Sequence, residues 1–493
     1  MDKFGKLNNQ LKTLAKYASA LALLGWDEEV NLPPLGHGFR GEVNALLSSD
    51  LHKKVTSPEL VDLVDELAAA DNFSKLNPDQ QVVVRETKRD IDHAKKIPPE
   101  FVERMALLTS KAFGVWVEAR KKSDFKLYQP VLQEIVELKK QEAELIGYDG
   151  SPYDALLDEF EPGMTSAKVD ALFVPLAKEL AELIGGLNLE TMPKLPEFKY
   201  DIEKQKQLNS EIAQALGYDM QSGLISISPH PFTISMHSSD VRVTTRYDEN
   251  DFWVAIGSTI HEVGHALYEQ GLPSGQWGTP LGEAVSLGIH ESQSRSWENF
   301  VGRSRSFTDF MYPKLETHFG KLPYSADELY LWLNKVKPVP IRVESDEVTY
   351  NLHIILRYEL EKDLIEGRLN VTDLPAAWND KVKKYLGLEI KNDAEGVLQD
   401  VHWSHASFGY FPTYTLGNLY AAQLFESAKK ATPNLEAGFA KGEFKPLLDW
   451  FRKNIHEQGR RYHPDELVER ATGQKPDSSY LIDHLKSKTK LHP

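Results

Sequence analysis

The chain of 493 residues contains no cysteine. Disulfide bonds and thiolate metal ligands are therefore excluded, so a bound metal has to be held by His, Asp or Glu. The absence also fits a reducing compartment, and we expect a cytoplasmic location. No apolar run reaches the ~20 residues that a membrane-spanning helix needs, so the sequence predicts no membrane association.

Dense Lys/Arg runs are also missing, and the net charge is −16. Nucleic-acid-binding proteins normally carry a basic patch, so we expect no nucleic-acid partner. Residues 17–26 form a short apolar stretch that follows Lys12 and Lys16 and runs straight into Asp27. Its apolar side chains fall on one helical face, which favours an amphipathic helix over a signal peptide.

Apolar residues recur at helical spacing along most of the chain. Residues 98–122 begin with two prolines and place Phe101, Met105 and Leu108 on one face, and residues 130–147 repeat the pattern up to Gly147. Long helices that pack on one another are the expected result, so the predicted fold class is mainly α.

Residues 224–250 break the helical pattern. They are rich in Ile, Ser, Thr and Val with local alternation, which predicts two or three short strands. An exposed edge strand in this small sheet would hold an extended peptide, although a purely structural hairpin accounts for the residues equally well.

No sharp linker divides the chain, and residues 187–201 are the best candidate boundary. We predict a single unit over residues 1–493. Within it, an N-terminal helical portion, residues 1–190, closes over a catalytic portion, residues 191–493.

One segment carries the chemistry: His261, Glu262 and His265 form an H-E-x-x-H pattern. Two histidines four residues apart lie on the same face of a helix and can bind one metal ion. Glu262 is offset by about 100° around the helix, within reach of a metal-bound water, as a general base requires. The pattern therefore predicts a metal-dependent peptidase, but it supplies only two protein ligands.

The third ligand is left open by the spacing. A third His at metzincin spacing is excluded, because Tyr268 stands at the glycine position and Gly271 at the last histidine position. The following helical stretch, residues 282–302, offers two carboxylates of equal standing, Glu283 and Glu291. Either would complete a His₂Glu set that leaves a position for water.

Several separated motifs resemble the carboxypeptidase Taq family of metallocarboxypeptidases. The residues that carry the resemblance are HEVGH at 261–265, HESQ at 290–293, HPF at 230–232, DVRVT at 240–244, IRVESD at 341–346 and GVLQDVHW at 396–403. The resemblance covers nearly the whole chain and departs at Ser345, where the family usually has Ala.

This resemblance implies a large helical zincin fold with a deep substrate groove and a small sheet beside the active-site helix. It implies zinc-dependent release of single amino acids from peptide C-termini with broad specificity, and a homodimer. It also makes His261, His265 and Glu291 the metal ligands and Glu262 the base. Zinc is the expected cofactor, with cobalt or manganese as replacements.

The transition state needs hydrogen-bond donors besides the metal. Residues 402–418 offer His405, Tyr410 and Tyr414. Similar helical zinc peptidases use a His and a Tyr from such a segment, so His405 and Tyr414 are expected to act, with Tyr410 close behind. Packing in an aromatic core is the structural alternative.

A carboxypeptidase must also bind the free carboxylate of its substrate, for which a bidentate Arg is suited. Arg342 is the first choice and Arg242 the second. Their structural alternatives are ion pairs with Asp346 and Asp240. His230 is a further candidate for positioning the substrate.

Two other functions fit the same residues. A zinc oligopeptidase on this scaffold would lack a positive group that closes the groove near the leaving residue. A non-catalytic helical protein with a peptide-binding groove would have no use for Glu262.

Overall fold

The computed structural model describes residues 2–187 and 193–491, and its architecture is helical around one small sheet. The first part of the chain forms α1 (Lys3–Val30), α2 (His37–Val55), α3 (Pro58–Ala68), α4 (Ala70–Phe73), α5 (Pro78–Lys96), α6 (Pro99–Lys122), α7 (Phe125–Ile146), α8 (Pro152–Leu157), α9 (Ser166–Gly185) and α10 (Ile202–Leu216). After the sheet come α11 (Phe252–Glu269), α12 (Leu287–Arg295), the π-helix η5 (Ser296–Gly302), α13 (Arg305–Phe319), α14 (Ala326–Leu333), α15 (Tyr350–Ile365), α16 (Leu374–Leu386), the 3₁₀ helix η8 (His402–His405), α17 (Pro412–Ala431), α18 (Leu435–Phe439), α19 (Lys445–Asn454), α20 (Pro464–Thr472) and α21 (Ser479–Thr489). The mainly α fold class is confirmed.

The predicted helix limits are reproduced where the sequence carried clear signals. Residues 98–122 form α6, which starts at Pro99, and α7 ends where Gly147 caps it. Residues 17–26 lie inside α1, whose first turn is capped by the Asp2 side chain. Among the described helices, none is long and apolar enough to cross a membrane.

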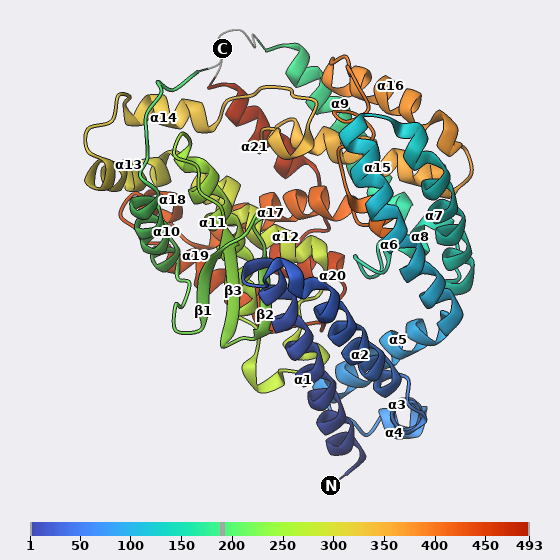
Figure 1. The fold of residues 1–493 in the computed structure, drawn as a ribbon. Helices are drawn as coiled ribbons and strands as arrows, with labels where there is room; N and C mark the ends of the chain where they lie inside the picture. The colour runs from blue at the N-terminus through green and yellow to red at the C-terminus, as the bar shows by residue number, and fades with distance from the viewer. Residues whose placement is uncertain (1, 188–192, 492–493) are drawn as a thin grey trace.

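The predicted strands form a three-stranded sheet in the order β1-β3-β2. The strands are β1 (Gly223–Ile227), β2 (Thr233–His237) and β3 (Asp240–Thr245). β1 pairs parallel and β2 antiparallel with β3, so β2 is an edge strand. The sheet lies against α11, and α1 crosses beside β2, where the Ser19 hydroxyl donates to the carbonyl oxygen of Met236 at 2.5 Å (Figure 1).

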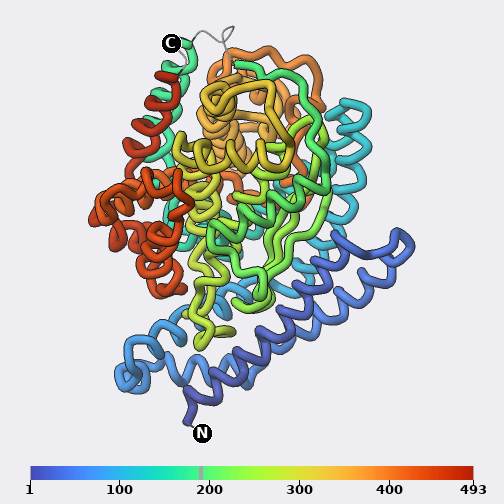
Figure 2. The backbone as a smooth tube through the Cα atoms, turned by 90° about the vertical axis from the view of Figure 1, so that its left-hand side faces the viewer, coloured from blue at the N-terminus to red at the C-terminus, as the bar shows by residue number. Residues whose placement is uncertain are grey.

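Two hydrophobic cores hold the chain. The larger core runs from α6 to α21, and a small one joins α1, α3 and α5 to Leu281. Figure 2 shows α1 and α2 as a long antiparallel pair that reaches out from the main body. The change of core thus falls between α5 and α6. The division near residue 190 stays a prediction, and residues 188–192 of its candidate boundary lie outside the described residues.

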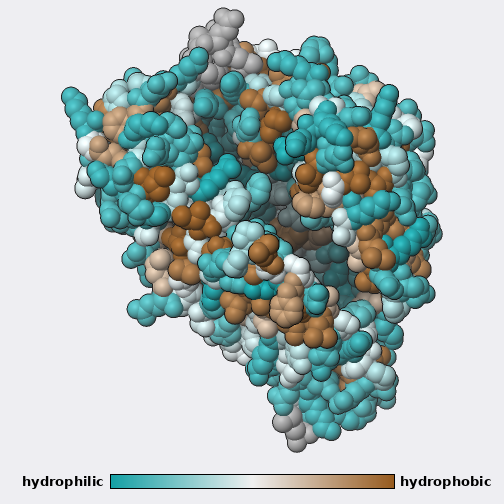
Figure 3. Space-filling view, in the orientation of Figure 1, coloured by the Kyte–Doolittle hydropathy of each residue, from teal (hydrophilic) through white to brown (hydrophobic). Residues whose placement is uncertain are grey.

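Three helices meet at the centre of the larger core. The helix α12 packs tightly against α17, and α11 packs against α12 (Figure 1). Small residues permit this approach: a Cβ on Gly264 of α11 would come within 2.6 Å of the Cα of Ser294, and a Cβ on Gly417 of α17 within 2.5 Å of Cγ of Glu291. The face that carries the sheet is hollowed at its centre (Figure 3).

Candidate active site

The two histidines of the H-E-x-x-H pattern lie on one face of α11. Their rings are 5.0 Å apart, as expected for side chains one turn apart. The helix begins at Phe252, where the Asp251 side chain accepts a hydrogen bond from the backbone N–H of Trp253 at 2.9 Å. The pattern therefore lies in the middle of a capped helix.

Glu291 of α12 completes a three-residue cluster with these histidines. Its Oε2 lies 3.7 Å from Nε2 of His261 and 3.4 Å from Nε2 of His265. One ligand atom from each residue falls within 4.8 Å of the others, the spacing of donors around a single metal ion. In contrast, Glu283 precedes α12 and pairs with Arg460 at 3.1 Å. The geometry thus favours Glu291 over Glu283.

Both histidines are oriented through their other ring nitrogen. Nδ1 of His261 lies 2.8 Å from Oε2 of Glu298, and Nδ1 of His265 lies 2.6 Å from Nδ1 of His290. Nε2 of His290 in turn lies 2.9 Å from Oε1 of Glu269. Such partners fix the tautomer, so that both Nε2 lone pairs point toward the cluster.

Arg295 holds the carboxylates ionised. Its Nε donates to Oε1 of Glu291 at 2.7 Å and its Nη1 to Oε2 of Glu298 at 3.0 Å. Burial alone would raise the pKa of Glu291, but Arg295 and the two histidines together bring that pKa well below its ordinary value. The sequence reading missed Arg295, although its position four residues after Glu291 places the two side chains on one helix face.

Glu262 is buried beside the cluster. Its Oε2 accepts a hydrogen bond from the Thr233 hydroxyl of β2 at 2.7 Å. Burial raises the pKa of Glu262, and the neighbouring His261 partly offsets the rise. A carboxylate with a raised pKa is suited to taking and returning a proton. No sequence signal pointed to Thr233, because the contact depends on how the sheet packs on α11.

One cavity of 400 Å³ is lined by the three clustered residues, Glu262 and Thr233, together with Tyr410 and Tyr414. The two tyrosine rings are 5.3 Å apart; Tyr414 lies in the first turn of α17, and Tyr410 lies just before that helix. His405 lies elsewhere: it is exposed and packs edge-on against Phe113 at 5.4 Å. The histidine beside the tyrosines is His402, whose Nε2 lies 3.2 Å from the Tyr414 hydroxyl.

Comparisons with known proteins identify the family of this chain. The family model described as carboxypeptidase Taq (M32) metallopeptidase matches residues 6–489. This chain belongs to the M32 family. Thermostable carboxypeptidase 1 of Thermus thermophilus is 42% identical over 96% of each chain, and carboxypeptidase 1 of Bacillus subtilis is 41% identical over 97% of this chain and 96% of that one. The crystal structure of an M32 carboxypeptidase from Deinococcus radiodurans superimposes with a TM-score of 0.97 at 36% identity, over 99% of both chains.

The D-x-R-x-T motif of this M32 chain holds an ion pair on the sheet. Arg242 makes two hydrogen bonds to Asp240, at 2.8 and 2.9 Å, and its guanidinium stacks over the Trp26 ring at 4.5 Å. Arg242 therefore forms the ion pair with Asp240 that was its structural alternative, and its role in substrate binding stays a prediction. His230, of the H-P-F motif, is exposed and does not line the metal cavity, whereas Phe232 and Thr233 do.

Arg342 is buried and strongly held. Its Nε and Nη2 donate to Oδ1 of Asp400 at 3.0 and 2.7 Å, and its Nη1 donates to the Tyr350 hydroxyl at 3.2 Å. The suggested pair with Asp346 is wrong, because Asp346 instead accepts backbone N–H groups at the start of α15. The guanidinium lies 5.2 Å from the Tyr414 ring, which borders the metal cavity.

Proposed function

We propose that this M32 metallopeptidase is a zinc carboxypeptidase that hydrolyses the last bond of a peptide and releases one amino acid. The observation that carries the proposal is the cluster of His261, His265 and Glu291 with Glu262 beside it. Two imidazoles and one carboxylate are a usual ligand set of catalytic zinc, and the buried carboxylate supplies the base. Cobalt or manganese is expected to replace zinc.

Zinc, when bound, supplies a Lewis acid for the scissile carbonyl and acidifies a water molecule. Glu262 takes the proton from the attacking water and passes it to the leaving amine. Thr233 fixes the orientation of that carboxylate during both transfers. Tyr414 donates its hydroxyl proton in a hydrogen bond to the carbonyl oxygen as negative charge develops there.

The segment of residues 402–418 supplies the remaining polar groups. The contact between His402 and Tyr414 favours His402 over His405 as the histidine that orients the tyrosine hydroxyl. Burial lowers the pKa of His402 to about 4, so its imidazole is neutral at pH 7 and accepts or donates a hydrogen bond. Tyr410 stands next to Tyr414 as a second donor.

Arg342 remains our choice for recognition of the substrate carboxylate. Its Nη1 points to Tyr350 and its guanidinium borders Tyr414, whereas Arg242 is held at the sheet by Asp240 and Trp26. This assignment distinguishes a carboxypeptidase from an oligopeptidase. The homodimer stays a prediction from the family resemblance, and the cytoplasmic location stays a prediction from the absence of cysteine.

Metal titration of two matched variants tests the ligand set. After removal of metal with a chelator, the wild-type protein is expected to take up one zinc per chain and to regain peptide hydrolysis. Glu291→Gln should lose zinc uptake, because the amide carries no charge. Glu283→Gln, which alters the rival carboxylate, should retain both properties. The reverse pattern would refute the proposed site.

A further inference from the structure

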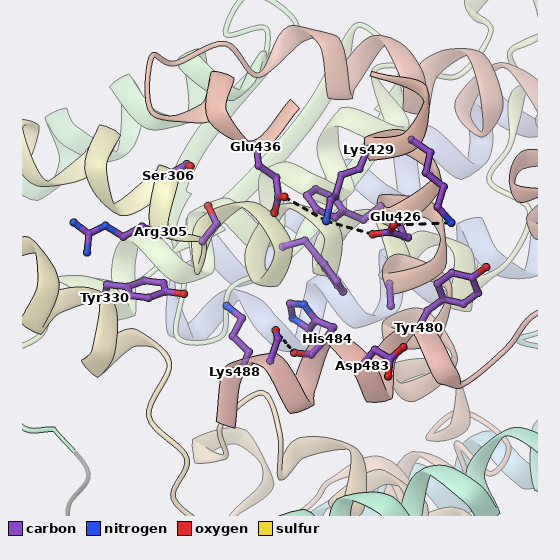
Figure 4. Close-up of a pocket in the computed structure, with 16 residues that line it drawn as sticks. Arg305, Ser306, Tyr330, Glu426, Lys429, Glu436, Tyr480, Asp483, His484 and Lys488 are labelled. Carbon is purple, nitrogen blue, oxygen red and sulfur yellow. Dashed lines mark hydrogen bonds and ion pairs between the residues drawn. The ribbon is translucent and has the colours of Figure 1, made fainter. Parts of the chain in front are cut away.

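A second cavity lies along the C-terminal half of α17, whereas the metal cavity lies at the start of that helix. It has a volume of 730 Å³, well within the range of small-molecule sites. The segments that line it are η5, the start of α13, α14, α17, α18 and α21 (Figure 4). None of the residues assigned above to the metal, the base or the substrate lines this cavity.

Aromatic side chains form the floor of the cavity, and a largely buried glutamate holds one of them in place. The His484 ring stacks on Phe300 at 4.2 Å, and its Nε2 lies 2.6 Å from Oε1 of Glu347. Phe425 packs against Phe300 at 5.2 Å. Apolar rings at the base and a fixed polar edge are what a ligand with an apolar side chain requires.

Lys488 presents a nearly buried ammonium at the same floor. Only 7% of the residue is exposed, and its Nζ donates to Oδ1 of Asn334 at 2.5 Å and to the carbonyl oxygen of Arg303 at 3.0 Å. An ammonium has three N–H donors, so one remains for a ligand. Glu347 is 4.0 Å from this Nζ, beyond hydrogen-bond distance.

The opposite wall carries charges of both signs. Lys429 lies between Glu426 and Glu436, at 3.3 Å from each carboxylate. In Figure 4 these three side chains face Lys488 and His484 across the cavity, while Arg305 points away from it. Arg305 is held outside by Asp309 at 2.9 Å and by Asp327.

The cavity is therefore electrically balanced. Apart from Arg305, which points away and is paired with Asp309 and Asp327, its lining offers three ammonium groups, of Lys429, Lys430 and Lys488, and three carboxylates, of Glu426, Glu436 and Asp483. A simple anion such as phosphate would meet as many repelling as attracting groups. A ligand with both an ammonium and a carboxylate finds a partner for each, and an apolar side chain fits the aromatic floor.

We propose that this cavity binds a free amino acid with a large apolar side chain, or a short peptide ending in one. Its carboxylate would lie toward Lys488 and its ammonium toward Glu436. Such molecules are what the enzyme releases, so the choice of ligand rests on the proposed function. The site would sense product at a distance from the metal.

Calorimetric titration of the metal-loaded enzyme with L-phenylalanine tests the proposal. The Ser487→Trp variant fills the cavity from its exposed rim, and Ser110→Trp on α6 is the matched control. One binding site per chain should disappear in Ser487→Trp and persist in Ser110→Trp. Unchanged thermal unfolding midpoints and peptide hydrolysis show that both variants are folded, independently of whether the amino acid binds.

Ligand analogues test the charge assignment. N-acetyl-L-phenylalanine lacks the ammonium and L-phenylalanine amide lacks the carboxylate, so each should bind about tenfold more weakly than L-phenylalanine. Glu436→Gln should lower the affinity for L-phenylalanine but leave the affinity for N-acetyl-L-phenylalanine unchanged. The proposal is overturned if all three compounds bind equally well, or if inorganic phosphate binds in their place. It is also overturned if the titration is unchanged in Ser487→Trp, or if L-phenylalanine does not bind the wild-type enzyme, even when peptide hydrolysis proceeds as expected.

Discussion

Removing the charge of Glu298 should weaken metal binding without touching a metal ligand. Its Oε2 holds Nδ1 of His261 at 2.8 Å and Nη1 of Arg295 at 3.0 Å, and its side chain is only 13% exposed. Glu298→Gln keeps the size of the side chain but removes the charge that stabilises the His261 tautomer. Loss of such an outer partner typically lowers metal affinity about 10- to 100-fold, or about 1.4–2.8 kcal/mol.

Competition with a chelator of known affinity measures this effect directly. The zinc dissociation constant of Glu298→Gln should rise by that factor, while kcat at saturating zinc falls less. Glu316→Gln, an exposed glutamate on α13, serves as the control. A zinc affinity within about twofold of wild type would refute the view that Glu298 orients His261, because that loss is too small for a buried charged partner.

Three further perturbations follow from the same geometry. Glu262→Gln should lower kcat by about 10²- to 10⁴-fold while zinc uptake is retained. If kcat and zinc affinity fall by the same factor, Glu262 is instead a metal-binding residue. Gly264→Ala should lower the free energy of unfolding by about 1–3 kcal/mol or more, since its Cβ would meet Ser294, whereas Gly114→Ala, with no neighbour within 4 Å, should be neutral or stabilising in chemical denaturation. Burial raises the pKa of Glu161 to about 7, so its contribution to stability is full below about pH 4.5 and is lost as the pH rises through 7. Between pH 5 and pH 8 the free energy of unfolding of the wild type should therefore fall by about 2.5 kcal/mol more than that of Glu161→Gln, and parallel pH profiles would contradict this.

Local patterns predicted the elements and the catalytic helix well. The spacing of apolar side chains located α6 and α7, and Gly147 marked the end of α7 as expected. The H-E-x-x-H pattern placed His261 and His265 on one face without any tertiary information, because four residues make about one helical turn.

Contacts between segments that are distant in the chain could not be predicted from the spacing of residues. Spacing did not separate Glu291 from Glu283, and only the family resemblance favoured Glu291. In the structure Glu291 lies 3.4 Å from His265, whereas Glu283 pairs with Arg460, which lies 177 positions away. The partner of Arg342 was sought four residues away, but it is Asp400, 58 positions along the chain. The partner of a buried charged side chain depends on how distant segments pack together, and local sequence periodicity carries no information about that packing.

The segment around His402 shows a similar limit at short range. His402 and His405 stand at opposite ends of the 3₁₀ helix η8, and Ala406 follows in a left-handed conformation. The turn exposes His405 and directs His402 to Tyr414. Two histidines three positions apart are equivalent candidates until the direction of such a turn is known.

Amino-acid release from one peptide, offered with a free and with an amidated C-terminus, decides whether this enzyme is a metal-dependent carboxypeptidase. The zinc-loaded enzyme is expected to release the last residue of the free peptide and to cut the amidated peptide far more slowly, and a chelator is expected to abolish release. Equal cleavage of the two peptides, or release that persists without metal, would contradict it.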